Sequence, residues 1–274
     1  MKALNMQEIQ QVSLEILKQV ADICDEQGLR YFLAYGTLIG AIRHKNTIPW
    51  DDDIDIMMPR PDYDKLLRYF ESHKEQLYPL QAMNDDTAKD YPYLITRISD
   101  ARYELDVINE KPYGIGVFID IYPLDGLGNN LDEAKATINK TKDLSSLVFL
   151  ATRKYFHRGN TKSLLKCVVK VPAFVYAKLR GKKAFSKVSY EIAKKYEYET
   201  SKYVGCVLWP TYRERDIFER NLFEETVKVQ FGKYEFAAPK EYDTVLRQIY
   251  RDYMKLPPEK DRAPHHLYSA YKKG

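Results

Sequence analysis

The stretch from Tyr31 to Met58 constrains the fold more than any other part of the chain, because it sets four aspartates into an apolar pattern. From Asp53 to Met57, polar and apolar residues alternate, which is the period of a half-buried strand. Asp53 and Asp55 then point to one face, and the isoleucines beside them point to the core. Cα atoms two residues apart on a strand lie roughly 7 Å from each other, so both carboxylates can reach one metal site.

A solvated acidic turn is the competing interpretation of this cluster, which also contains Asp51 and Asp52. An ionised aspartate inside an apolar strand is costly unless it is paired or metal-bound, and aspartate is a poor strand former. The alternation therefore favours a metal site at Asp53 and Asp55. Asp52 is out of phase with them, and we interpret it as structural.

The residues just before the acidic strand favour an anion site. Tyr31 to Tyr35 reads as a strand, Gly36 as a turn, and Thr37 as the N-cap of a short helix from Leu38 to Arg43. A helix N-terminus entered through glycine offers free backbone N–H groups and a positive dipole end. One half of the Tyr31–Met58 stretch thus suits a phosphate, and the other half suits the cations that bind it.

A lone acid marks a second strand, from Gly114 to Gly126. Its isoleucines and valine line one face, and Asp120 lies on the other face in the middle of the run. Such a position is unfavourable for an ordinary strand residue but suits the third ligand of a two-metal site. The alternative is an aspartate that caps or pairs at the end of a sheet. Asp125 and Gly126 read as a turn, so no chemistry is assigned to Asp125.

These motifs resemble the signature of the LicD family in Gly36-Thr37, Arg43-His44 and the run from Ile48 to Ile56. That family comprises bacterial phosphocholine transferases with a nucleotidyltransferase (polymerase-β-like) fold and is similar to the fukutin-related sugar-phosphate transferases. Its superfamily places a Gly-Ser/Thr element before an Asp-x-Asp strand and takes a third carboxylate from a later strand. The resemblance resumes near the C-terminus in residues 239–243, 250–258 and 262–266.

The resemblance implies an α+β fold with a mixed sheet core, flanking helices and a basic helical insertion. We divide the chain into a catalytic core at residues 1–130, the insertion at 131–200 and a C-terminal part at 201–274 that completes the core and the substrate site.

The resemblance also implies a reaction. CDP-choline would be the donor, phosphocholine the transferred group, and a sugar hydroxyl on a lipid-linked glycan, a teichoic-acid or lipopolysaccharide precursor, the acceptor, with release of CMP. Asp53, Asp55 and Asp120 would be the catalytic residues and would hold two Mg²⁺ ions about 4 Å apart, with Mn²⁺ as the alternative ion. Asp120 is the usual candidate for the general base of the superfamily.

The expected substrate contacts come mainly from the same stretch. Backbone N–H groups at the helix start would bind the donor phosphates, and Arg43 would add a charge-assisted contact. Trp50 either stacks near the base or packs in the core, and the C-terminal histidine pair either contacts substrate or lies on the surface. The expected substrate-binding residues are Tyr35, Gly36, Thr37, Arg43, His44, Trp50, His265 and His266.

The same acidic residues are also compatible with other functions. The two-metal site could transfer ribitol phosphate or a nucleotide instead. A glycosyltransferase would need an N-terminal βαβ series, and the first thirty residues offer one helix. A non-catalytic module that binds Ca²⁺ and a membrane is a third hypothesis. An EF-hand loop starting at Asp51 would need Gly at position 56 and Glu at position 62, where this chain has Ile56 and Asp62.

The segment from Ala151 to Thr200 is helical in pattern and basic, with thirteen Lys or Arg residues against three Glu, although the whole chain carries only +4. In residues 162–183, apolar positions are flanked by cations, which suits a helix on an anionic membrane surface. A helical insertion that packs on the protein is the alternative. Pro172 would kink or split this helix. No nucleic-acid module is recognisable, so nucleic acid is not an expected partner.

Composition places the chain among ordinary soluble proteins, with 45% apolar and 30% charged residues. No signal peptide or transmembrane run is evident. Three widely spaced cysteines indicate reduced thiols and a cytoplasmic location, with peripheral contact to the inner face of the plasma membrane through residues 162–183. Further expected elements are helices at 6–27 (ending at Gly28), 63–73 (capped by Asp62) and 242–254, and strands at 78–83 and 93–99.

Overall fold

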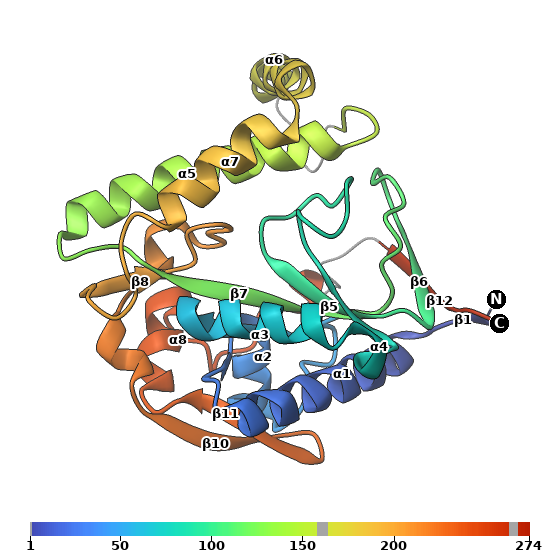
Figure 1. Ribbon diagram of the computed structural model, residues 1–274, viewed down its shortest axis with the longest axis vertical. Coiled ribbons are helices and arrows are strands. Elements are labelled where there is room, and N and C mark those ends of the chain that lie inside the picture. The colour runs from blue at the N-terminus through green and yellow to red at the C-terminus, as the bar shows by residue number, and fades with distance from the viewer. Residues whose placement is uncertain (1, 158–163, 263–267) are drawn as a thin grey trace.

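The computed structural model describes residues 2–157, 164–262 and 268–274 (Figure 1), without the side chains of residues 164–169 and 261. His265 and His266 lie outside the described residues.

A seven-stranded mixed sheet forms the centre of the molecule, in the order β2-β3-β7-β5-β4 with β8 and β9 continuing from β7. The pair β3–β7 is parallel and the other pairs are antiparallel. All residues of β3, β5 and β7 are buried, because helices and loops cover both faces of the sheet. The strands are β2 (Phe32–Leu33), β3 (Asp55–Pro59), β4 (Leu80–Met83), β5 (Thr96–Asp100), β7 (Phe118–Gly126), β8 (Tyr203–Gly205) and β9 (Ile217–Glu219).

Two smaller sheets flank this core. The first joins the two chain ends, which lie side by side in Figure 1, in the order β1 (Lys2–Ala3), β12 (Tyr268–Lys272) and β6 (Tyr103–Val107). The second is the hairpin of β10 (Thr226–Phe231) and β11 (Tyr234–Pro239).

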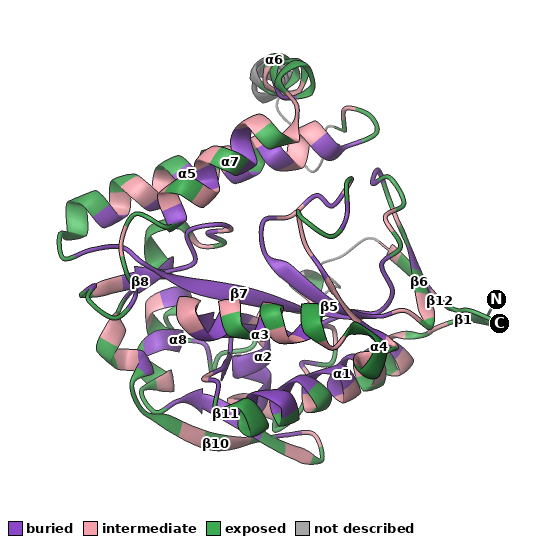
Figure 2. Cartoon of the chain, viewed as in Figure 1, coloured by how far each residue is buried: buried purple, intermediate pink, exposed green. Residues whose placement is uncertain are grey.

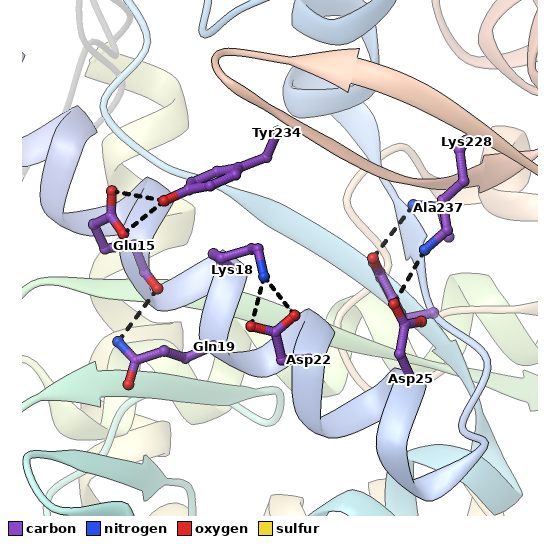
Figure 3. Close-up of polar contacts among 9 residues, drawn as sticks. Glu15, Lys18, Gln19, Asp22, Asp25, Lys228, Tyr234 and Ala237 are labelled. Carbon is purple, nitrogen blue, oxygen red and sulfur yellow. Dashed lines mark hydrogen bonds and ion pairs between the residues drawn. The ribbon is translucent and has the colours of Figure 1, made fainter.

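Helix α1 (Met6–Gln27) packs against the sheet and carries the hairpin on its other side. Its buried residues recur at helical spacing, so Figure 2 shows one side buried and the other exposed. A capping box at Asn5 starts the helix. Gly28 in the left-handed conformation ends it, as predicted from the sequence. Figure 3 shows Tyr234 and Lys228 of the hairpin reaching Glu15 and Asp25 of α1.

Three helices from residues 131–193 lie together on one side of the sheet, which confirms the predicted helical segment. They are α5 (Leu131–Thr152), α6 (Leu164–Arg180) and α7 (Lys182–Ala193). Residues of α5 and α7 share an apolar cluster with Leu94, Leu127 and Ile217 of the sheet region. Figure 1 shows α6 farthest from the sheet. Pro172 lies inside α6 and does not split it. Among the described helices, none is long and apolar enough to cross a lipid bilayer.

Local predictions differ from the structure at Asp62, at Asp125 and at the end of the C-terminal helix. Helix α3 (Arg60–Ser72) begins at Arg60, so Asp62 does not cap it; Asp62 lies in its first turn and pairs with Arg30 instead. Asp125 is a buried residue of β7 rather than part of a turn, and its carboxylate pairs with Arg60. Helix α8 (Tyr242–Tyr250) ends four residues early. For Asp62 and Asp125, an ion pair with an arginine overrides the local signal. The short helix α4 (Lys74–Leu77) follows α3 after a single residue, His73.

Candidate metal and substrate site

The three predicted carboxylates meet at the parallel pair of central strands. Asp55 is the first residue of β3 and is the direct register partner of Asp120 in β7. Asp53 lies two residues before Asp55, just outside the strand. One carboxylate oxygen from each of the three lies within 4.8 Å of the others. The alternation in the sequence therefore predicted which acids converge, although β3 begins two residues later than expected.

The environment of Asp55 fits a bound cation. Asp55 is 7% exposed, and its Oδ1 atom is buried without a hydrogen-bond partner among the described residues. Burial raises the pKa of Asp55 well above its ordinary value, and the neighbouring charges of Asp53 and Asp120 raise it further. Carboxylates this close repel one another unless a proton or a cation lies between them. A group of hard oxygen ligands with one unsatisfied buried oxygen suits a divalent cation such as Mg²⁺ or Mn²⁺.

Arg97 of β5 is the counter-charge that the sequence interpretation missed. It is the register partner of Asp120, and its Nε–H donates to Asp120 Oδ1 at 2.7 Å. Both side chains are almost fully buried. The guanidinium lies between the rings of Tyr93 and Phe118, with its central carbon 3.9 Å from each ring centroid. This packing fixes the orientation of the Asp120 carboxylate toward the other two acids.

The helix before the acidic strand starts earlier than predicted. Helix α2 (Tyr35–Ile39) has Ala34 as its N-cap and continues into a π-helical turn at Gly40–His44. Thr37 is thus inside the helix, and the prediction that it is the N-cap is wrong. Its hydroxyl instead accepts the Asp55 backbone N–H at 2.8 Å, which ties the helix to the start of β3.

Gly36 and Asp51 approach each other closely at this point. A Cβ atom on Gly36 would lie 2.6 Å from Asp51 Oδ2, so a larger residue would displace that carboxylate. The chain therefore needs glycine here for close approach to the acidic loop, and not because of an unusual backbone angle.

A pocket of about 550 Å³ opens beside Asp53 and Asp55. Of the predicted substrate contacts, Thr37 and His44 are outside its lining. Its lining residues include the predicted Tyr35, Gly36, Arg43 and Trp50, together with Ile39, Ile48, Asp51, Tyr122, Trp209, Thr211, Tyr212, Tyr250, Asp252, Tyr253, Lys255 and Pro257.

Arg43 connects the helical side of the pocket with the C-terminal side. Its Nε–H donates to His44 Nε2 at 2.9 Å, and its terminal N–H donates to the Tyr253 carbonyl at 2.6 Å. Trp50 lies under the guanidinium of Arg262, 5.3 Å from its central carbon. Both predicted residues thus line the pocket, and both already have partners within the chain.

Aromatic residues form the other wall, and apart from Tyr35 the sequence analysis did not single them out. The rings of Tyr35 and Tyr122 have centroids 5.0 Å apart, and those of Tyr212 and Tyr250 are 5.1 Å apart. Both pairs are packed edge to face. Trp209 joins them in lining the pocket.

Asp216 supports this wall from behind. It is fully buried, and it accepts hydrogen bonds from the Tyr35 hydroxyl at 3.1 Å and from the Tyr212 backbone N–H. Burial raises its pKa from 3.8 to about 6. In the sequence Asp216 stands in a run of charged residues, so no local pattern distinguishes it from a surface acid.

Comparisons with known proteins match this chain to one family. The family model described as LicD/FKTN/FKRP, nucleotidyltransferase domain, matches residues 28–125. The chain is 31% identical over 277 residues to the lipopolysaccharide cholinephosphotransferase LicD of Haemophilus influenzae, with 99% of each chain covered. A stretch of 42 residues is 43% identical to the ribitol 5-phosphate transferase FKRP of human and mouse, which covers 15% of this chain and 8% of FKRP.

Proposed function

We infer that this chain, which belongs to the LicD family and is a transferase, moves phosphocholine from CDP-choline to a sugar hydroxyl of a lipopolysaccharide or teichoic-acid precursor. The acceptor oxygen forms a new bond to the choline-bearing phosphorus, the bond from that phosphorus to CMP breaks, and the hydroxyl proton is lost. The observation that carries this proposal is the buried carboxylate cluster at the edge of the pocket, with an unsatisfied Asp55 oxygen.

We propose that two Mg²⁺ ions are held by Asp53, Asp55 and Asp120. The sheet core that positions these residues is proposed to be of the nucleotidyltransferase type. When bound, the ions would favour loss of the acceptor proton and neutralise charge on the leaving nucleotide. Arg97 keeps the Asp120 carboxylate fixed, and Thr37 fixes the position of Asp55 through its backbone. A preorganised ligand set of this kind avoids reorganisation during the reaction.

The helical side of the pocket suits the donor phosphates. The first turn of α2 carries backbone N–H groups without a side-chain cap, because its N-cap residue, Ala34, has no polar side chain that could accept a hydrogen bond from them. Gly36 lines this wall of the pocket, and Arg43 supplies positive charge at the same wall. Trp50 then lies near the nucleotide side of the pocket.

Release of CMP from CDP-choline tests the reaction. The assay compares wild-type protein with Asp53→Asn, with and without Mg²⁺, in the presence of a glycan precursor acceptor. We expect release that needs both metal and acceptor and that falls by at least about 100-fold in the variant. Asp106→Asn, an exposed acid on β6, is the matched control and should retain full activity. Metal-independent release, or an active Asp53→Asn protein, would contradict the proposal.

Transfer of ribitol phosphate is the second candidate, and the similarity to FKRP favours it. The same assay with CDP-ribitol in place of CDP-choline separates the two donors. A higher kcat/KM for CDP-ribitol than for CDP-choline would assign ribitol-phosphate transfer to the chain, with the same carboxylates as metal ligands.

Helix α6 is proposed to rest on an anionic membrane, where a lipid-linked acceptor would be found. Val171, Val175 and Leu179 recur every four residues and are 42%, 49% and 81% exposed. Figure 2 shows exposed residues on the described part of this helix. Lys170 and Arg180 are exposed cations on the same helix, and Lys183 and Lys187 are exposed on α7, which follows it in the chain. An apolar stripe bordered by lysine and arginine binds the interface of anionic bilayers.

Sedimentation with lipid vesicles tests this contact. We expect binding to vesicles with anionic lipid, weakening with salt, and little binding to zwitterionic vesicles. The double variant Val175→Asp/Leu179→Asp should lose binding, whereas Ile108→Asp, at another exposed apolar residue, should not. Equal binding by all three proteins would assign the lipid contact elsewhere.

A further inference from the structure

We propose that Tyr122, Trp209 and Tyr250 bind the quaternary ammonium group of the donor and thereby select choline over other head groups. This inference rests on the proposed function, because it concerns the donor of that reaction. It adds a recognition site to the catalytic one, in the part of the pocket that the sequence interpretation did not assign.

The position of Tyr122 relative to the carboxylates fits the length of phosphocholine. Tyr122 follows Asp120 by two residues in β7, so both side chains lie on the same face of the strand. Their Cα atoms are therefore roughly 7 Å apart. This length is comparable with the reach from phosphorus to nitrogen across the two-carbon linker of phosphocholine. A phosphate held beside the carboxylates would place its ammonium group at the aromatic wall.

The wall presents rings at different angles. The planes of Tyr212 and Tyr250 meet at 70°, and their hydroxyl groups hydrogen-bond to each other at 2.9 Å. Trp209 is packed from behind by Tyr93, with centroids 5.3 Å apart. A methylated ammonium ion is recognised by such a set of ring faces, because its charge is spread over methyl groups that cannot donate strong hydrogen bonds.

No cation of the described residues lies over the rings proposed to bind choline. Within the described residues, cations lie over the rings of Trp50 and Tyr212, from Arg262 and Arg215, but none is found over Tyr122, Trp209 or Tyr250. A cation that enters this part of the pocket can therefore contact these ring faces.

The same environment disfavours a primary ammonium ion. Ethanolamine would bring N–H donors against ring faces, where they lose hydrogen bonds that water supplies. The wall should therefore discriminate CDP-choline from CDP-ethanolamine, although both carry one positive charge.

Donor kinetics of Tyr250 variants test the inference. Tyr250→Leu removes a ring face, and we expect the KM for CDP-choline to rise about tenfold, with less than a twofold change for CDP-ethanolamine. Tyr250→Phe keeps the ring and should retain the wild-type preference. An active Tyr250→Leu enzyme that keeps the wild-type preference for CDP-choline would overturn the inference while leaving the proposed function intact.

A binding measurement keeps the inference testable if no donor is turned over. The chain has two tryptophans, so Trp50→Phe leaves Trp209 as the reporter. Titration with tetramethylammonium should change Trp209 fluorescence saturably, and Tyr250→Leu in this background should weaken the binding several-fold. A linear response, or equal binding by the Tyr250→Leu protein, would overturn the inference independently of catalysis.

Discussion

Arg97 and Asp120 form a buried ion pair between neighbouring strands, and this pair decides the charge balance of the site. The cation partly compensates three carboxylates, and its packing between two rings prevents it from moving away. Among the described residues, the Oδ1 atom of Asp55 still has no hydrogen-bond partner. The site thus retains an excess of negative charge that favours cation binding at the expense of stability in the metal-free state.

We expect Asp55→Asn to stabilise the metal-free protein while abolishing transfer. The amide removes a buried charge next to two acids, and it can donate a hydrogen bond where Asp55 Oδ1 has none. The melting temperature of the variant should exceed that of wild type in EDTA. Added Mg²⁺ should raise the melting temperature of wild type only. A variant less stable than wild type in EDTA would contradict this account.

Asp216 should make stability depend on pH. Its pKa is raised from 3.8 to about 6, which corresponds to about 3 kcal/mol. The folded state therefore binds the proton more tightly than the unfolded state, and this contribution is present below about pH 4 and lost as the pH rises through 6. Asp216→Asn stays neutral, so the stability of the variant relative to wild type should increase from pH 4 to 7.

Urea unfolding at several pH values measures this difference. The loss of the hydrogen bonds to Tyr35 and Tyr212 destabilises the variant by an amount that does not depend on pH. The test is therefore how the stability difference between variant and wild type changes with pH. Asp106→Asn, at an exposed position, should give no comparable slope. A stability difference that is constant with pH would show that Asp216 does not titrate in this range.

The sequence predicted the acids of the site but not their partners. Asp53, Asp55 and Asp120 interrupt apolar alternation, and that signal is local. Arg97 reads as an ordinary strand cation, and its role depends on being opposite Asp120 in the sheet. The aromatic wall comes from segments that are distant in sequence, so no spacing rule could have grouped it. Only the order of the strands brings these residues together.

At the scale of elements, predictions held where caps and periodicity agree. Helix α1 has both a capping box and a terminal glycine, and its bounds were predicted. Helix α2 has no capping box, since its N-cap is Ala34, and Tyr35 takes a positive φ of 45°. At Gly40 it continues into a π-helical turn instead of ending. The position of α2 depends on the contact between Thr37 and β3, which is not a local signal.

Gly116 should be essential for the junction of β5, β6 and β7. A Cβ atom there would lie 1.9 Å from the Asp100 carbonyl oxygen and 2.8 Å from that of Tyr103, and both are backbone atoms that cannot rotate away. We expect Gly116→Ala to lower the free energy of unfolding by at least about 2 kcal/mol. Gly28→Ala is the comparison, because its Cβ meets open space and the cost of its left-handed backbone is about 1 kcal/mol. Equal losses in urea unfolding would contradict the clash.

At the scale of the molecule, the helical segment 131–200 is joined to the core. Its buried residues belong to a cluster that includes Leu94, Leu127 and Ile217. The divisions at residues 130 and 200 remain a prediction about sequence organisation. The mixed sheet follows the predicted α+β class, but the order of its strands, and the small sheet that joins the two chain ends, depend on pairings between distant segments.

The shared cluster predicts that the helices and the main core unfold together. Trp209 packs near the ring of Phe149 in α5, and Trp50 packs against the main core, so the two tryptophans report on the two regions. Removing α5 and α7 would expose apolar residues of the sheet, which couples the regions by burial. Trp50→Phe and Trp209→Phe proteins should therefore show urea transitions with the same midpoint, after correction for each variant by circular dichroism. An earlier transition of Trp209 would mean that the helical segment unfolds on its own and that the cluster does not bind it to the sheet.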